Sequence, residues 1–145
     1  MVKVFAIGNF LMSDDKIGLL IGEKLIEELK EYQVKVFICE TDIGYALSNI
    51  EEKDFIIIID AMHRGGKAGE IEIFPISDLE RIITYTQHSL SLLSLINFYK
   101  IKGYIIGIEA ADLGYGIDIS QVLRGSFNEI YNQVLKKIKL FIIKQ

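Results

Sequence analysis

The chain has 145 residues, half of them are hydrophobic, and its formal net charge is −4. This length suits one domain with a substantial core, and the apolar content excludes a disordered chain. The acidic balance argues against nucleic-acid binding, and the cluster of lysines near the C-terminus is typical of a solvated helix end: Lys136, Lys137, Lys139 and Lys144.

The number of cysteines and the length of the apolar runs exclude further classes of protein. Cys39 is the only cysteine, so an intrachain disulfide and a cysteine-based zinc site are both excluded. The apolar runs are far shorter than the roughly 20 residues that a membrane-spanning helix needs. The first residues enter a strand pattern at once, without a basic region or a cleavage site. We therefore expect a cytoplasmic protein that is not inserted in a membrane.

The first elements in the chain are a strand and a helix joined by a polar loop. Residues Val2–Ile7 are apolar except for one lysine, which predicts a strand that ends at Gly8-Asn9. Apolar residues at helical spacing predict a helix over residues 17–29. Ser13 or Asp14 is well placed as the N-cap of that helix.

The rest of the chain continues the alternation of strands and helices. Residues 55–59 form an unbroken apolar run, which predicts a central strand covered on both faces and ended by Asp60. The glycine-rich residues 64–69 cannot be a helix interior, and polar alternation over residues 70–74 predicts a more exposed strand. The other predicted elements are strands over residues 34–39 and 104–108 and helices over residues 45–50, 88–99 and 119–138.

This order of elements predicts a single α/β domain over residues 1–145, with helices on both faces of a mostly parallel sheet. In open sheets of this kind the ligand site lies beyond the carboxyl ends of the strands. Carboxylates follow four of the predicted strands, and His63 or His88 could join them. A mixed set of carboxylates and imidazole suits a metal such as zinc or nickel. The acidic residues concerned are Asp14, Asp15, Glu40, Asp42, Asp60 and Glu109.

Each candidate also has a plainer interpretation. Asp14 and Asp15 could only cap the helix that follows them. Asp60 is harder to explain in that way, because a carboxylate directly after a buried run is costly unless it is paired or reached by solvent. His88 could be a helix cap or a surface residue, and His63 is expected to be exposed beside its glycines. Dinucleotide, P-loop, nucleophile-elbow and HExxH motifs are all missing from the sequence.

Several motifs occur in a fixed order along almost the whole chain. They are AIGNFLMSDDKIG at residues 6–18, IDA at 59–61, TQHSLSL at 86–92 and GIE at 107–109, and a long helix follows. In this ordered set the chain resembles the hydrogenase maturation endopeptidases, which trim the C-terminus of the large subunit of nickel–iron hydrogenases.

The resemblance implies a fold, a site and a substrate. The sheet would have five strands, with the strand at residues 70–74 antiparallel to the others. Asp15, Asp60 and His88 would be the metal-binding and catalytic residues. The partner would be the precursor of a hydrogenase large subunit, and nickel would be supplied by that precursor, with other divalent metals able to substitute. The protein would then be a metal-dependent endopeptidase that recognises nickel in its substrate.

One departure from the family motif leaves alternatives open. Lys16 stands where the family has glycine, directly beside Asp15. Its ammonium group could weaken cation binding by repulsion, or it could swing into solvent with little effect. The alternatives are a non-catalytic metal-sensing or chaperone module on the same fold, and a peptidase of this fold that acts on another protein.

Overall fold

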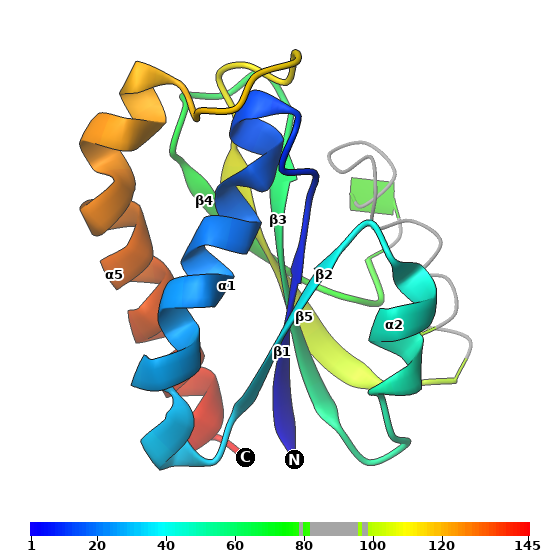
Figure 1. Ribbon diagram of the computed structural model, residues 1–145. Coiled ribbons are helices and arrows are strands. Elements are labelled where there is room, and N and C mark those ends of the chain that lie inside the picture. Colours follow the sequence, from blue (N-terminus) through cyan, green and yellow to red (C-terminus); the bar gives the residue numbers. More distant parts are fainter. Residues whose placement is uncertain (79, 82–95, 97–98) are drawn as a thin grey trace.

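The computed structural model describes residues 1–78, 80–81, 96 and 99–145, and its centre is a five-stranded sheet (Figure 1). The strands lie side by side in the order β2-β1-β3-β5-β4. Only β4 runs antiparallel to its neighbour β5, as the family resemblance implied. The strands are β1 Val2–Ile7, β2 Lys35–Glu40, β3 Phe55–Met62, β4 Ile71–Pro75 and β5 Lys102–Glu109.

Helices cover both faces of this sheet, as the sequence predicts. Helices α1 and α5 lie on one face and α2 lies on the other (Figure 1). The α-helices are α1 Ile17–Glu28, α2 Ile43–Ser48 and α5 Gln121–Ile143, and the two 3-10 helices are η1 Ser13–Lys16 and η2 Lys30–Tyr32. The helix predicted near residues 88–99 lies outside the described residues except for the buried Ile96 and the exposed residues 99 and 100. Among the described residues, no helix combines the length and the apolar character needed to cross a membrane.

Strand β3 separates two hydrophobic cores, which explains its unbroken apolar sequence. Ile57 and Ile59 belong to the core under α1 and α5. Ile56 and Ile58 point to the opposite core, which also contains Ile96. Because successive strand residues alternate between faces, a strand with a core on each face needs apolar side chains at every position.

Several predicted boundaries differ from the structure, and two of them concern the site. The 3-10 helix η1 precedes α1, and neither Ser13 nor Asp14 caps α1 with its side chain. Strand β3 continues to Met62, so Asp60 lies inside the strand and not after it. The last helix begins at Gln121 and not at residue 119, and it extends to Ile143.

Candidate active site

The loop between β1 and α1 holds Asp15 at the carboxyl edge of the sheet. Asp15 is only 4% exposed, and its Oδ2 accepts a hydrogen bond of 3.0 Å from the backbone N–H of Asn9. Gly8 has a φ of +152°, and a Cβ atom there would lie 2.2 Å from the carbonyl oxygen of Asp15. Only glycine therefore allows the end of β1 to lie against the backbone of Asp15.

A second glycine sets the distance between α1 and the central strands. A Cβ atom on Gly18 would lie 2.8 Å from the carbonyl oxygen of Ile59 and 3.0 Å from that of Ile7. The first turn of α1 thus packs directly on the backbone of β1 and β3. Ile59 immediately precedes Asp60, so this contact brings the Asp15 loop to the edge of the sheet where Asp60 lies.

Asp60 is fully buried in β3, where it pairs with Gly107 of β5. The alternation of the strand places it on the same face as Ile56 and Ile58, the face covered by α2. An aspartate at such a position carries a high desolvation cost. It lies toward the carboxyl end of a parallel sheet, where ligand sites are found. The structure thus keeps Asp60 among the site candidates.

Asp14, by contrast, has a structural role. It is fully buried, and its carboxylate accepts hydrogen bonds from three backbone N–H groups, those of Ala111 at 2.9 Å, Asp112 at 2.8 Å and Ser120 at 2.6 Å. These bonds attach the loop after β5 and the start of α5 to η1. The two adjacent aspartates therefore differ in their hydrogen-bond partners, and Asp14 joins η1 to segments far away in the sequence.

Glu109 also anchors a loop. It is 1% exposed at the end of β5, and its carboxylate accepts hydrogen bonds from the backbone N–H groups of Arg64, Gly65 and Gly66 at 3.0 to 3.3 Å. The Arg64 Nε atom lies 3.8 Å from Glu109 Oε2. These donors account for the burial of this carboxylate and explain why the glycine-rich loop stays against the edge of the sheet.

The remaining edge residues stay apart from this arrangement. Asp42 caps α2 by accepting a hydrogen bond from Tyr45 N at 2.9 Å, and Glu40 and His63 are exposed. Burial, assisted by the charge of Asp42, raises the pKa of the Cys39 thiol to about 12, so this cysteine is a protonated core residue and not a nucleophile.

The predicted metal site is only partly covered by the structure. Asp15 and Asp60 are described, but His88 lies outside the described residues. Within residues 1–78, 80–81, 96 and 99–145, no three His, Cys, Asp or Glu side chains are grouped closely enough to hold a metal ion. Membership of Asp15, Asp60 and His88 in one metal site therefore stays a prediction.

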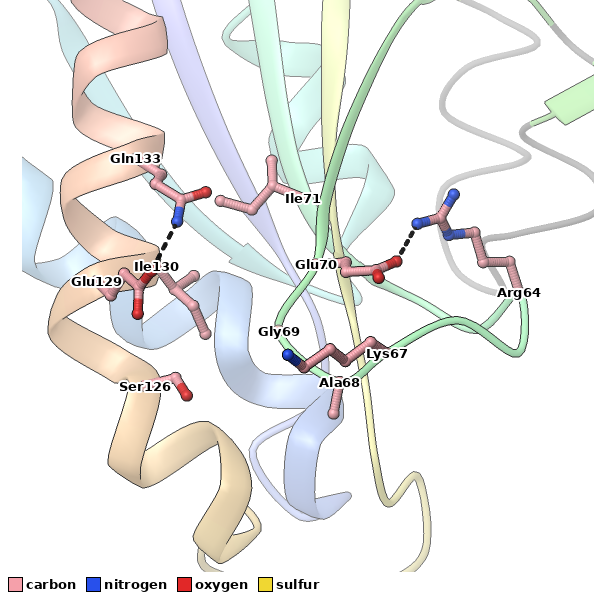
Figure 2. Close-up of a pocket in the computed structure, with 10 residues that line it drawn as sticks. All are labelled: Arg64, Lys67, Ala68, Gly69, Glu70, Ile71, Ser126, Glu129, Ile130 and Gln133. Atoms are coloured by element: carbon pink, nitrogen blue, oxygen red, sulfur yellow. Dashed lines mark hydrogen bonds and ion pairs between the residues drawn. The ribbon is translucent and has the colours of Figure 1, made fainter.

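Lys16 packs most of its side chain against the protein. It is 8% exposed, and its side chain lines a groove of about 500 Å³ between α1 and α5. A second groove, of about 340 Å³, lies on the other flank of α5, between that helix and residues 64–71 (Figure 2). Figure 2 shows the Arg64–Glu70 ion pair at one side of this second groove and the Glu129–Gln133 pair on α5 at the other.

Comparison with known proteins identifies the family. The model of the hydrogenase maturation protease family matches residues 20–137, which is most of the chain. The chain belongs to the hydrogenase maturation protease family. The match includes Asp60 and position 88 and begins just after the loop that carries Asp15.

Individual hydrogenase maturation proteases agree with this assignment. The hydrogenase 3 maturation protease of Escherichia coli K12 is 28% identical over 140 residues, which cover 90% of this chain and 86% of that protein. The [NiFe] hydrogenase maturation protease HybD of Thermococcus kodakarensis is 25% identical, with a TM-score of 0.74 over 93% of this chain and 97% of that structure. The E. coli endopeptidase HybD is 21% identical, has a TM-score of 0.75 and covers 95% and 91%, which supports the fold.

This hydrogenase maturation protease is thus a hydrolase of the peptidase class, as the resemblance implied. Sequence reasoning missed how its loops are held. The carboxylate of Glu109 was placed at the correct edge but was considered only as a candidate ligand. The signal that could have revealed its role is the glycine pair Gly65-Gly66, whose unhindered N–H groups commonly surround an anion.

Proposed function

We propose that this protein is an endopeptidase that removes a C-terminal peptide from the nickel-loaded precursor of a nickel–iron hydrogenase large subunit. Family membership supports the reaction class, and the E. coli relative is named as a maturation protease of hydrogenase 3. The observation that carries the proposal is the placement of Asp15 and Asp60, two almost fully buried carboxylates, at the carboxyl edge of the sheet.

The donor types fit nickel as part of the substrate. Carboxylate oxygens and an imidazole nitrogen are suitable ligands for nickel and zinc, so Asp15, Asp60 and His88 form a chemically reasonable set. Three protein ligands leave coordination positions open, and nickel already bound by the precursor would use the remaining positions for its own ligands. Recognition would then depend on completed nickel insertion, and the protease would need no stable metal of its own.

The chain's own residues would position the scissile peptide and the attacking water. The backbone N–H of Asn9 holds the Asp15 carboxylate, and strand pairing with Gly107 fixes the backbone position of Asp60. Nickel supplies Lewis acidity when it is bound in the precursor. One carboxylate would accept a proton from water as the water attacks the peptide carbonyl, and the amine that leaves would receive a proton.

The experiment is the mass of the precursor before and after incubation with the protease. Nickel-loaded precursor is incubated with wild type and with Asp15→Asn, Asp60→Asn and His88→Ala. Each variant is expected to lower the rate of cleavage at least a hundredfold, because it removes a group that would act in the reaction. Glu40→Gln and His63→Ala are the matched controls, since both residues are exposed at the same edge, and they should cleave like wild type.

Nickel dependence is tested with the same precursor after removal of its nickel, which should remain uncut. Normal cleavage by all three site variants would refute the residue assignment. A protein that binds the precursor only when nickel is present, yet leaves its mass unchanged, would instead be a non-catalytic sensing module, and the proposed reaction would be wrong.

A further inference from the structure

The groove between α1 and α5, called here the α1–α5 groove, has an unusual charge for this protein. Its lining includes Lys16, Leu20 and Lys24 from the α1 side and Asp118, Arg124 and Phe127 from the α5 side. These six residues include three cations and one carboxylate, whereas the whole chain has a net charge of −4. A basic groove on an acidic protein favours an anionic ligand.

Lys16 is a cation in this groove that has no hydrogen-bond or ion-pair partner within the described residues. It is 8% exposed. The other two cations are already engaged, since Arg124 Nη2 lies 3.7 Å from Asp118 Oδ1 and Lys24 Nζ lies 4.3 Å from the centre of the Tyr131 ring. Among the described residues, the Lys16 ammonium nitrogen is not one of the buried polar atoms that lack a partner, so solvent reaches it and it is open to a ligand carboxylate.

The shape of the groove suits an extended peptide. Leu20 and Lys24 lie on α1, and Lys16 is the N-cap of that helix, so the four-residue spacing places the two lysines about 12 Å apart along the helix axis. An extended peptide covers this distance with about four residues. Leu20 and Phe127 provide apolar surface between the charged ends, so acidic side chains alternating with apolar ones would match the lining.

The groove on the other flank of α5 is a weaker candidate. Its lining contains two cations and two carboxylates, and Arg64 is already paired with Glu70, Glu72 and Glu109. The α1–α5 groove also begins directly beside Asp15, because Lys16 is the next residue in the chain. The groove lies on the α1 and α5 face of the sheet and Asp60 on the α2 face, so a bound peptide would reach Asp60 by passing over the carboxyl edge of the sheet.

We infer that the α1–α5 groove binds acidic side chains of the precursor's C-terminal segment, and that Lys16 positions that segment beside Asp15. The inference rests on the proposed function for the identity of the peptide. It gives Lys16 a role as a residue that selects acidic substrates.

Binding is measured first, without cleavage or nickel. The probe is a fluorescein-labelled synthetic peptide in which glutamate and leucine alternate and the C-terminus is amidated, and its fluorescence anisotropy is followed as the full-length protein is added. Replacement of every glutamate by glutamine in the peptide, or Lys16→Gln in the protein, should weaken binding about tenfold, since each removes a charge-assisted hydrogen bond. Arg124→Gln should weaken it several-fold, and its exposed position makes a folding defect improbable.

Lys137→Gln is the matched control, because Lys137 is exposed on α5 outside the groove lining, and it should bind the peptide like wild type. The inference is wrong if Lys16→Gln and Arg124→Gln both bind like wild type, or if Lys137→Gln weakens binding as much as they do. The same peptide with a free C-terminal carboxylate is tested beside the amidated one. If only the free-carboxylate peptide binds, the inference is wrong, because the protein then recognises the terminus and not the acidic side chains.

A second measurement separates this inference from the proposed function. With nickel-loaded precursor, Arg124→Gln should raise KM several-fold with kcat within twofold of wild type. If wild type does not cleave the precursor but binds the acidic peptide through Lys16, the proposed function fails and the groove assignment stands. If wild type cleaves the precursor and neither groove variant changes KM, the groove assignment fails and the proposed function stands.

Discussion

Gly18 offers a direct test of how the start of α1 is placed against the sheet. An alanine at this position would put its Cβ 2.8 Å from the carbonyl oxygen of Ile59 and 3.0 Å from that of Ile7. Both atoms belong to the backbone of central strands, which cannot move as a flexible side chain can. The substitution should therefore displace α1, at an overpacking cost of about 1–3 kcal/mol.

Gly125 is the matched control for this substitution. It also lies within a helix, but a Cβ atom there would meet nothing within 4 Å. Gly125→Ala should therefore show the favourable helix propensity of alanine alone, about 1 kcal/mol. Because that gain applies broadly to both positions, the difference in unfolding free energy between the two variants isolates the contact of Gly18 and should be about 1–3 kcal/mol.

The measurement is urea unfolding of both variants and wild type, followed by circular dichroism, together with the rate of precursor cleavage under folding conditions. We expect Gly18→Ala to be less stable than Gly125→Ala and to cleave at least tenfold more slowly, because displacement of η1 misplaces Asp15 relative to Asp60. If Gly18→Ala is as stable as Gly125→Ala, the close approach of α1 to β3 is incorrect. Equal stability with normal cleavage would also refute the role of Gly18 in placing Asp15.

Two further predictions concern buried charges. Asp14→Asn should lower the unfolding free energy by about 2–3 kcal/mol, because the Asp14 carboxylate accepts three backbone hydrogen bonds. Asp15→Asn should mainly lower the rate of cleavage. Equal losses of stability in urea unfolding would contradict this difference between the two residues. At the opposite edge of the sheet, burial disfavours the charged form of Asp54. The Lys3 ammonium at 2.6 Å, the Glu51 N–H and the charge of the N-terminus together outweigh burial and lower the Asp54 pKa. The stabilisation from Asp54 is thus present above its unfolded pKa of about 3.9 and lost as pH falls through the lower folded value. Wild type should lose more stability than Asp54→Asn between pH 5 and about pH 2, and parallel curves would refute the pair's contribution.

Much of the fold could be predicted because its local patterns report burial directly. Residues 55–59 predicted a central strand, and β3 indeed has a hydrophobic core on each face. The polar alternation of residues 70–74 predicted a less buried strand, and β4 lies at the edge of the sheet. The order of strands and loops also placed Asp15 and Asp60 toward the carboxyl edge of the sheet, where the structure has them.

The boundaries near the site could not be predicted for a specific reason. A helix start was expected at Ser13 or Asp14 because such residues commonly cap helices. In the structure the Asp14 carboxylate bonds instead to residues 111, 112 and 120, about a hundred positions later in the chain. No local pattern identifies donors so distant in sequence, so the capping preference was overruled by tertiary contacts.

The sequence by itself determined the α/β architecture, the central position of β3 and the family motifs around Asp15 and Asp60. The tertiary structure alone decided that Asp14, and not its neighbour Asp15, anchors the loop after β5 and the start of α5. It also decided that Lys16 lines a groove between α1 and α5, helices separated by more than 90 residues. The physical reason is that periodicity records how deeply a residue is buried, whereas its partners depend on how distant segments pack together.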